Sequence, residues 1–592
     1  MYDYDKKGSV YLGNIKTLSK SVREYKKYAI MTPIFMVGEV LVECMIPFLT
    51  AGLVNAIRAG CDMQTITRYG LLLLAMAVLS LSFGALAGRT AAIASCGFAK
   101  NLRHDLFVSV QKFSFSNIDK FSTSSLVTRL TTDVANVQMA FMMLIRSVVR
   151  SPLMITFSLI MALAISPKLS VAFAVVVPIL AIGLLMIMKN AMPIFRSVFK
   201  KYDTLNNSVQ ENVSGMRVVK AYVREDYEKE KFNRASDEVA ADFTRAEKIL
   251  AFNAPLMQLC FNLLNLAISF FGTMLIIKTG GRELDIGGYS SLLTYGAQIL
   301  MSLMMLSMVI VMLSMSVASA NRICEVLREE SAIANPESPV TEVRDGSIIF
   351  DHVQFSYSGN LEKRALSDIN FFIASGETVG VIGGTGSGKS SLVQLISRLY
   401  DVTEGSVKVG GVDVRDYDLD ELRNQVAVVL QKNVLFSGTI KENLRWGNPD
   451  ADDEEMIRIC RLAQAHDFVS AFPEGYDTHI EQGGTNVSGG QKQRLCIARA
   501  LLKKPKILIL DDSTSAVDTK TDALIRRAFA EEIPDTTKII IAQRISSVEH
   551  ADKIVVMDGG RIESMGTHEE LLVKSPIYRE VYESQTKGGQ EE

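Results

Sequence analysis

The sequence has 592 residues, a formal net charge of −2 and 7 scattered cysteines. Because one domain usually takes about 100–200 residues, this length allows several domains. The lack of a basic patch argues against a nucleic-acid partner, and the lack of a CxxC pair argues against a disulfide framework, so we expect free thiols. Long apolar stretches fill the chain up to about Ser319, whereas short aliphatic runs separated by charged turns begin near Val343. This composition predicts a membrane half followed by a soluble α/β half.

Six apolar stretches in the first half are long enough, at about 20 residues or more, to cross a bilayer as helices. An even number of spans places both ends of the chain on one side of the membrane. The segments on that side carry many more Lys and Arg residues than the other three connections, which predicts that they are cytoplasmic. The first stretch is too long for a signal peptide, so we expect it to remain in the mature protein. The expected spans are 28–57, 69–97, 139–165, 169–188, 249–277 and 286–315.

Two acidic residues stand inside the first span. Glu39 and Glu43 are four residues apart and therefore share one face of a helix. Intramembrane acids usually face a cavity or a partner, so this pair could attract cationic cargo. The alternative is an ion pair with Arg89, Arg146 or Arg150 of neighbouring spans.

Methionines recur at helical spacing in the sixth span. Flexible thioether side chains suit promiscuous binding, so this stripe could line a polyspecific cargo cavity. Plain helix packing or lipid contact is the alternative. The stripe consists of Met301, Met305, Met308, Met312 and Met315.

A glycine-rich segment, GGTGSGKS, lies between the aliphatic run 379–382 and the helical pattern SLVQLISRLY. Strand, loop and helix in this order are the context of a phosphate-binding loop, in which backbone N–H groups surround phosphates. Lys389 would reach the terminal phosphates and Ser390 would hold Mg²⁺. The predicted binding loop comprises Gly383, Gly384, Thr385, Gly386, Ser387, Gly388, Lys389, Ser390 and Ser391.

A second aliphatic run, ILIL at 507–510, stops at Asp511 and Asp512. Such a run predicts a buried strand that delivers carboxylates to its carboxyl end. An acidic residue that ends a strand neighbouring the phosphate loop suits the outer shell of its Mg²⁺, which gives Asp511 a role.

The run VSGGQ at 487–491 leads into KQRLCIARALLKKPKILILDD. With these motifs in order, the soluble half resembles the nucleotide-binding domain of an ATP-binding cassette (ABC) transporter. The whole chain resembles an exporter half-transporter, which implies a six-helix all-α transmembrane domain with long cytoplasmic helical extensions, followed by an α/β P-loop domain. The expected parts are an N-terminal cytoplasmic segment (1–28), the transmembrane domain (29–320), a linker (321–345), the ATP-binding cassette domain (346–585) and a tail (586–592).

The resemblance assigns roles to further residues. Tyr357 would stack on adenine, although a strand-face tyrosine is the alternative. Gln431 would contact Mg²⁺, together with Ser390 and Asp511, and link the cassette to the membrane half. The signature residues Ser488, Gly489, Gly490 and Gln491 would approach ATP bound to the other subunit. The loop Ser515, Ala516, Val517 and Asp518 would contact the partner's cassette.

The chain departs from the family pattern at two positions of the hydrolytic machinery. Asp512 stands where the family usually has a glutamate base, and Gln543 stands where it usually has a histidine. Asp is one methylene shorter than Glu, and a displacement of about 1 Å in a catalytic group can cost on the order of 10²-fold in rate. Gln543 lacks the charge and the proton chemistry of imidazole. We therefore expect ATP to bind here and to turn over slowly.

An impaired site beside a nearly intact signature predicts the degenerate-site subunit of a heterodimeric exporter in a bacterial plasma membrane. It would be an ATPase-coupled transporter that exports hydrophobic or amphipathic drugs, lipids or peptides with a non-identical partner. One rival is a homodimeric exporter in which Asp512 is an active base. A rival from another class is an ATP-binding channel or regulatory subunit that does not pump.

Overall fold

The computed structural model describes residues 13–360, 362–512 and 517–587. Contacts divide the chain into two compact units, Met1–Lys112 with Ser122–Glu329, and Phe113–Phe121 with Glu330–Glu592. The first unit is built from helices and the second combines sheets with helices, which confirms the expected fold class. All seven cysteines are free thiols, as expected.

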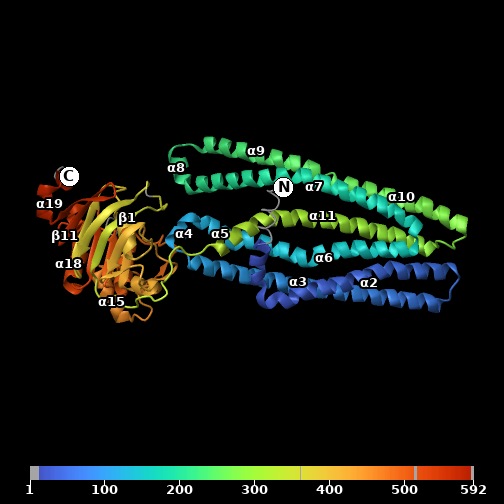
Figure 1. Cartoon of the computed structure of the whole chain (residues 1–592), viewed down its shortest axis with the longest axis horizontal. Coiled ribbons are helices and arrows are strands. Elements are labelled where there is room, and N and C mark those ends of the chain that lie inside the picture. Colours follow the sequence, from blue (N-terminus) through green and yellow to red (C-terminus); the bar gives the residue numbers. More distant parts are fainter. Residues whose placement is uncertain (1–12, 361, 513–516, 588–592) are drawn as a thin grey trace. The chain divides into compact units, whose positions relative to one another are not determined.

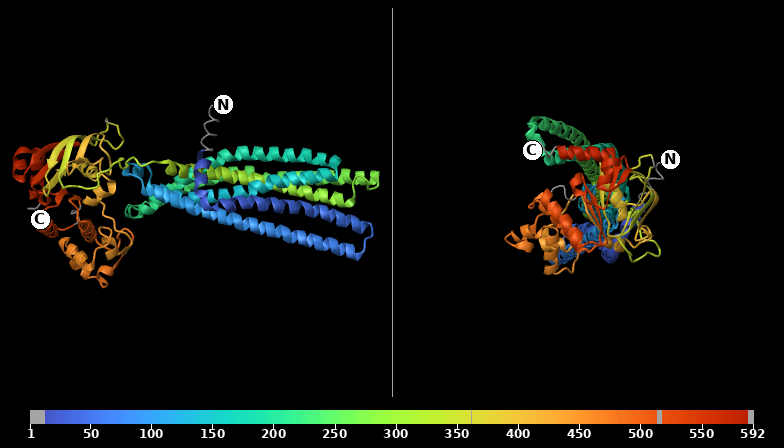
Figure 2. Two further views of the ribbon diagram at one scale, coloured as in Figure 1. Left: turned by 60° about the horizontal axis from the view of Figure 1, so that its bottom comes forward. Right: turned by 90° about the vertical axis from the view of Figure 1, so that its left-hand side faces the viewer.

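Six helical segments of the described chain are long and apolar enough to cross a membrane, which confirms the six expected spans. Their helices run alongside one another in the first unit (Figure 1, Figure 2). The short helix α8 (Met216–Ala221) connects α7 and α9. The long helices are α2 (Lys26–Arg58), α3 (Met63–Gln111), α6 (Val134–Ile165), α7 (Pro167–Ser214), α9 (Glu225–Leu250), α10 (Asn253–Thr279) and α11 (Ile286–Arg328).

One apolar core holds α6, α7, α10 and α11 together. Its buried side chains include Phe173 of α7, Leu264 and Ile268 of α10, and Leu292 of α11. Small residues let these helices approach closely, as membrane helix packing requires. At Gly296 of α11, for example, an added Cβ would lie 2.8 Å from a methyl carbon of Leu264.

The seam between α2 and α11 is closed near the ends of these helices at Arg58 and Ile286. A Cβ at Gly287 would lie 2.2 Å from the carbonyl oxygen of Ala51, so only glycine allows this approach. Three hydrogen bonds cross the seam. The Gly287 N–H donates to the Asn55 side chain at 3.0 Å, the Ser291 hydroxyl to the Pro47 carbonyl at 2.6 Å, and the Tyr295 hydroxyl to the Cys44 carbonyl at 2.7 Å.

The other ends of α6 and α11 are joined by ion pairs. Asp133 closes a short π-helical turn (Arg129–Asp133) and is fully buried. Arg322 of α11 donates to both carboxylate oxygens of Asp133, at 2.7 and 2.5 Å. Arg129 pairs with Glu325 at 2.8 Å. Buried charges are stable only when paired in this way, so these contacts fix the register of the two helices.

The second unit contains two main sheets (Figure 1). The antiparallel sheet has the order β2 (Leu366–Ile373), β1 (Ile348–Phe355), β4 (Glu404–Val409), β5 (Val412–Asp413). The larger sheet has the order β12 (Arg561–Gly566), β11 (Lys553–Asp558), β3 (Thr378–Gly383), β10 (Thr537–Ile541), β9 (Ile507–Asp511), β6 (Val426–Val429), and is parallel except for β12. Every residue of β9 and β10 is buried, which explains the aliphatic runs at 507–510 and 539–541.

The order of the larger sheet corrects one expectation. We expected the strand that ends at Asp511 to neighbour the strand before the phosphate loop, but β10 lies between β3 and β9. The strands are parallel, with Val381 opposite Ile541 and Ile541 opposite Asp511. Their carboxyl ends therefore meet at one edge of the sheet, which is where open α/β sheets bind ligands.

A short helix from between two spans belongs to the second unit. This helix, α4 (Phe115–Lys120), is held to the linker by Asn117, whose side chain donates to the Glu330 carbonyl at 3.0 Å and accepts from the Ala332 N–H at 3.1 Å. The Tyr400 hydroxyl donates to Asp119 of α4 at 2.5 Å. The ring of Phe115 packs edge-on against Tyr400, with centroids 6.1 Å apart.

Candidate nucleotide-binding site

The phosphate loop joins β3 to α12 (Lys389–Ile396) and is tight on its inner side. Gly383 and Gly388 have φ angles of 155° and 96°, and a Cβ at either would clash with backbone within 3 Å. Gly384 and Gly386 face open space, because a Cβ at either would meet nothing within 4 Å. Glycine backbone on an open side lets N–H groups approach a phosphate, so this cradle fits the triphosphate of a nucleotide.

Lys389 extends over this loop. Its ammonium donates to the carbonyls of Gly383 and Gly384 at 2.8 and 2.7 Å. Burial lowers the pKa of Lys389, while the carboxylates of Asp511 and Asp512 act in the opposite direction. An ammonium that is partly desolvated attracts an anion more strongly than one in water, because the local dielectric constant is lower.

Ser390 and Asp511 meet at the edge of the sheet. The Ser390 hydroxyl donates to Asp511 Oδ1 at 3.1 Å, and Asp511 is 5% exposed. Burial raises the pKa of Asp511, against the hydrogen bond from Ser390. A divalent cation would offset the cost of a buried carboxylate, and a hydroxyl with a carboxylate is a donor set that Mg²⁺ accepts. These residues therefore fit the expected magnesium position.

Asp512 lies beside the two glutamines that the sequence singled out. Gln543 Nε2 donates to Asp512 Oδ2 at 2.8 Å, and Gln431 Nε2 donates to the same oxygen at 3.3 Å. The backbone of Asp512 is left-handed, with φ of 47°, and its N–H donates to the Ile541 carbonyl at 3.0 Å. Asp tolerates this conformation better than most residues. Asp512 is thus in contact with Gln543, the other position at which the chain departs from the family pattern, and with Gln431.

Tyr357 is half exposed at the edge of the site. Its hydroxyl lies 2.8 Å from the Ser391 hydroxyl and 3.2 Å from Gln394 Oε1, both on α12. Its ring packs edge-on against Tyr400, with centroids 5.1 Å apart, and against Phe355 at 4.8 Å. Buried tyrosine and phenylalanine thus hold an exposed aromatic ring beside the phosphate loop.

The signature motif begins a helix and faces solvent in the single chain. Ser488 caps α17 (Gly489–Leu502), and its hydroxyl accepts from the Gln491 N–H at 3.3 Å. The Gln491 side chain accepts in return from the Ser488 N–H at 2.9 Å. This capping box satisfies the N–H groups of Ser488 and Gln491, and the first turn of α17 beyond them is a helix start of the kind that favours an anion.

The loop assigned to contact between cassettes is partly described. Ser515 and Ala516 lie outside the described residues. Val517 is buried, and Asp518 caps α18 (Thr519–Glu532) by accepting from the Thr521 N–H at 2.9 Å.

The intramembrane acids are paired with one arginine. Arg150 of α6 donates to both oxygens of Glu43, at 2.9 and 2.8 Å, and its Nε lies 3.7 Å from Glu39. Arg89 and Arg146 are exposed. In the structure, Glu39 and Glu43 therefore lie in ion-pair contact with Arg150, so that two carboxyl groups share one guanidinium. Met301, Met305, Met308 and Met315 are exposed on α11 in the single chain.

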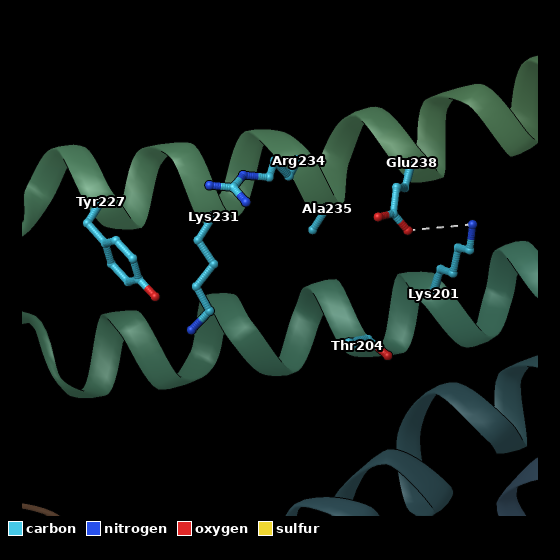
Figure 3. A pocket seen from close by; sticks show the side chains of 7 residues that line it. All are labelled: Lys201, Thr204, Tyr227, Lys231, Arg234, Ala235 and Glu238. Carbon is cyan, nitrogen blue, oxygen red and sulfur yellow. Dashed lines mark ion pairs between the residues drawn. The ribbon is translucent and has the colours of Figure 1, made fainter.

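A separate cavity of about 380 Å³ lies between α7 and α9 (Figure 3). Lys201 and Thr204 line it from α7, and Tyr227, Lys231 and Arg234 line it from α9. The cations have acidic neighbours, since Lys201 pairs with Asp242 at 2.8 Å and Arg234 pairs with Glu230 at 2.8 Å. Among the side chains that the structure describes, these ion pairs offset part of the positive charge of the cavity.

Sequence reasoning did not find the contact of Tyr400 with α4. Tyr400 ends the helical pattern SLVQLISRLY, Asp119 lies 281 positions away in a cytoplasmic extension, and no pattern indicates that the two are in contact. A tyrosine just after the phosphate-loop helix was the available signal, but spacing alone did not indicate its partner.

Two family models match the chain. The ABC transporter transmembrane region matches residues 29–317, and the ABC transporter domain matches residues 366–515. An uncharacterized ABC transporter ATP-binding protein of Bacillus subtilis (strain 168), YfiB, is 37% identical over 571 residues, which cover 96% of this chain and 98% of that protein. The chain therefore belongs to the ABC transporter family.

Other relatives have more specific names. A probable multidrug resistance ABC transporter ATP-binding/permease protein of Bacillus subtilis (strain 168), YheI, is 35% identical over 82% of this chain and 83% of its own length. An ATP-dependent lipid A-core flippase of Desulfotalea psychrophila is 33% identical over 82% of this chain and 84% of its own. The structure of a bacterial Atm1-family ABC exporter with ATP bound has the same fold, with a TM-score of 0.82 at 24% identity over 95% of this chain and 98% of that chain.

Together these findings define a half-transporter of the exporter type, with a transmembrane domain and an ATP-binding domain in one chain. It is a multi-pass membrane protein whose nucleotide-binding domain is cytoplasmic. Its ABC domain implies ATP binding and ATP-coupled transport, and exporters of this family act as dimers within a membrane.

Proposed function

We propose that this chain is the degenerate-site subunit of a heterodimeric exporter. Its own site binds ATP with Mg²⁺ and hydrolyses ATP slowly. Its signature residues complete the more active site of a non-identical partner. Closure of the two cassettes, relayed by the cytoplasmic helices, moves hydrophobic or amphipathic cargo outward.

The contact of Asp512 with two amides carries this proposal. A catalytic base must accept a proton from the attacking water, and Gln543 and Gln431 orient Asp512 for this by donating to its Oδ2. Neither amide can take up a proton at neutral pH, and neither carries a charge. The shorter side chain of Asp adds to this handicap. Slow hydrolysis follows from these three properties together.

The groups that hold the nucleotide keep the expected chemistry. Lys389 and the loop N–H groups would bind the phosphates, and Tyr357 would stack on the adenine. Ser390, Gln431 and Asp511 would hold Mg²⁺, which supplies charge neutralisation at the phosphates when it is bound. Tight binding with slow turnover is therefore the behaviour that we assign to this site.

The signature supports a role at the partner's site. Ser488, Gly489, Gly490 and Gln491 stand at an exposed helix start, where N–H groups and the helix dipole favour an anion. The loop 515–518 would contact the partner's cassette beside it. We infer that the partner carries the glutamate and the histidine that this chain lacks.

The membrane half supports an amphipathic cargo. The exposed methionines of α11 offer an adaptable apolar surface to cargo or to the partner. Glu39 and Glu43 form a cluster with Arg150, in which two carboxyl groups share one guanidinium. We propose that these carboxyl groups favour cations among the cargo molecules.

The test is the ATPase rate of this chain alone in lipid nanodiscs, beside the Asp512→Glu, Gln543→His double variant. We expect negligible turnover in the native chain and a rise on the order of 10²-fold in the double variant, because the base and its proton partner are restored. Asp512→Asn serves as the control that removes the base. Rapid turnover by the native chain alone would contradict the proposal and favour the homodimer.

A further inference from the structure

The C-terminal helix α20 (Pro576–Lys587) contacts the segment that carries Gln543. Gln585 makes this contact with both ends of its side-chain amide. Its Nε2 donates to the Gln543 carbonyl at 2.8 Å, and its Oε1 accepts from the Ile545 N–H at 2.9 Å. The two backbone groups are two residues apart on an extended segment, since Arg544 has φ of −99° and ψ of 129°. Gln585 thus offers the donor and acceptor that a neighbouring strand offers in a sheet.

This segment lies where regular structure ends. The N–H of Ala542 still bonds to the Val381 carbonyl of β3, at 3.2 Å, and a 3₁₀ turn begins at Ile545. Gln543 stands between them with an exposed side chain. Because that side chain has three rotatable bonds before its amide, its reach to Asp512 depends on where the backbone is held.

The helix that carries Gln585 is itself well anchored. Tyr578 of α20 is fully buried, and its hydroxyl lies 2.7 Å from the His568 ring. Ile545, at the other end of the bridge, is 1% exposed. The amide of Gln585 therefore connects two fixed points and fixes the backbone at Gln543.

We propose that Gln585 is a positioning residue for Gln543, through which the C-terminal helix sets the geometry of the nucleotide site. A shift of α20 would withdraw both hydrogen bonds and free the segment that presents Gln543 to Asp512. The proposal rests on the assigned role of Gln543 beside the nucleotide. It extends that role to a helix that belongs to none of the nucleotide-binding motifs.

The test is a double-mutant cycle in the full chain in nanodiscs. Gln585→Ala is made in the native chain and in Gln543→Ala, and single-turnover ATP hydrolysis and the Kd of a fluorescent ATP analogue are measured. Single turnover with excess protein resolves slow rates. We expect Gln585→Ala to lower the native rate about five-fold, the size of a lost positioning hydrogen bond, with the Kd changed less than about two-fold. In Gln543→Ala the same change is expected to have no further effect, because Gln585 acts through Gln543.

Ser584→Ala, an exposed position on the same helix, is the matched control and should leave the rate unchanged. Hydrogen exchange of the Ile545 amide gives an independent readout, and we expect it to accelerate in Gln585→Ala. An equal loss of rate in both backgrounds would show a merely structural role and overturn the proposal, as would an unchanged rate. Fast turnover in the native chain would instead contradict the proposed function, while the cycle would remain measurable.

Discussion

The two sides of the nucleotide site differ in how their groups are held. On the binding side, Lys389, Ser390 and Asp511 are fixed by tight glycine backbone and by buried strand ends. On the hydrolytic side, Asp512 accepts hydrogen bonds from the exposed side-chain amides of Gln431 and Gln543. Under the proposed function, this difference means that one cassette keeps the chemistry that holds ATP while it loses the chemistry that cleaves ATP. The following substitutions test whether binding and hydrolysis are separable in this way.

The largest expected effect comes from removal of the positive charge of Lys389, which lies on the binding side of the site. Lys389→Ala should weaken ATP binding on the order of 100-fold, because a charge-assisted contact with the phosphates is lost. Equilibrium binding of a fluorescent ATP analogue to the full chain measures the effect. Lys504→Ala, whose lysine pairs with Glu455 on the surface, is the control for a lost cation. Equal ATP affinity in Lys389→Ala and the native chain would contradict the assignment of Lys389 to ATP binding.

A smaller loss of ATP affinity is expected when the aromatic ring that would stack on adenine is removed. Tyr357→Ala should weaken ATP binding by at least about 5-fold, since stacking contributes at least about 1 kcal/mol per base. Tyr357→Phe keeps the ring and should bind ATP nearly as the native chain does. Tripolyphosphate, which has no base, is the matched ligand, and competition assays should show the same affinity in all three proteins. A parallel loss for tripolyphosphate would mean that Tyr357 supports the loop rather than the adenine.

The smallest effect on ATP affinity is expected for a substitution of Tyr400, whose ring packs against Tyr357. Tyr400→Phe removes the hydrogen bond to Asp119, so α4 should lose about 1 kcal/mol of stabilisation while ATP affinity changes less than about two-fold. Burial and the Asp119 acceptor raise the pKa of Tyr400, which keeps its hydroxyl a donor. Hydrogen exchange of residues 115–120 should accelerate about five-fold. Asp119→Asn retains an acceptor oxygen and should show a smaller change, whereas unchanged exchange in Tyr400→Phe would show that the bond does not hold α4.

Local chemistry made much of the molecule predictable. The fold class and the six spans followed from apolar stretches and ordered motifs, because length and periodicity act over a few turns of chain. The phosphate loop and Asp511 were visible for the same reason, since each motif carries its own chemistry in adjacent residues. The contact of Ser390 with Asp511 follows once β3, which leads into the phosphate loop, shares a sheet with β9, which ends at Asp511.

Contacts between distant residues were not predictable in the same way. The sequence offered three arginines for Glu39 and Glu43, and packing of α6 against α2 selects Arg150. The position of β10 between β3 and β9 depends on the whole sheet. The bridge of Gln585 joins residues 42 positions apart through one amide, and a single glutamine near the end of a chain has no pattern that marks it.

The closed seam between α2 and α11 sets an energetic threshold for opening at the outer face. Any state in which these helices part there must break the three hydrogen bonds of Gly287, Ser291 and Tyr295. Each hydrogen bond contributes about 1 kcal/mol, and a polar group left unsatisfied in lipid costs more. The free energy needed to separate the two helices here is therefore at least about 3 kcal/mol. Thermal motion alone would then open the seam in fewer than about one molecule in a hundred. Separation of α2 and α11 at this end therefore requires a source of free energy, and we expect ATP binding to supply it.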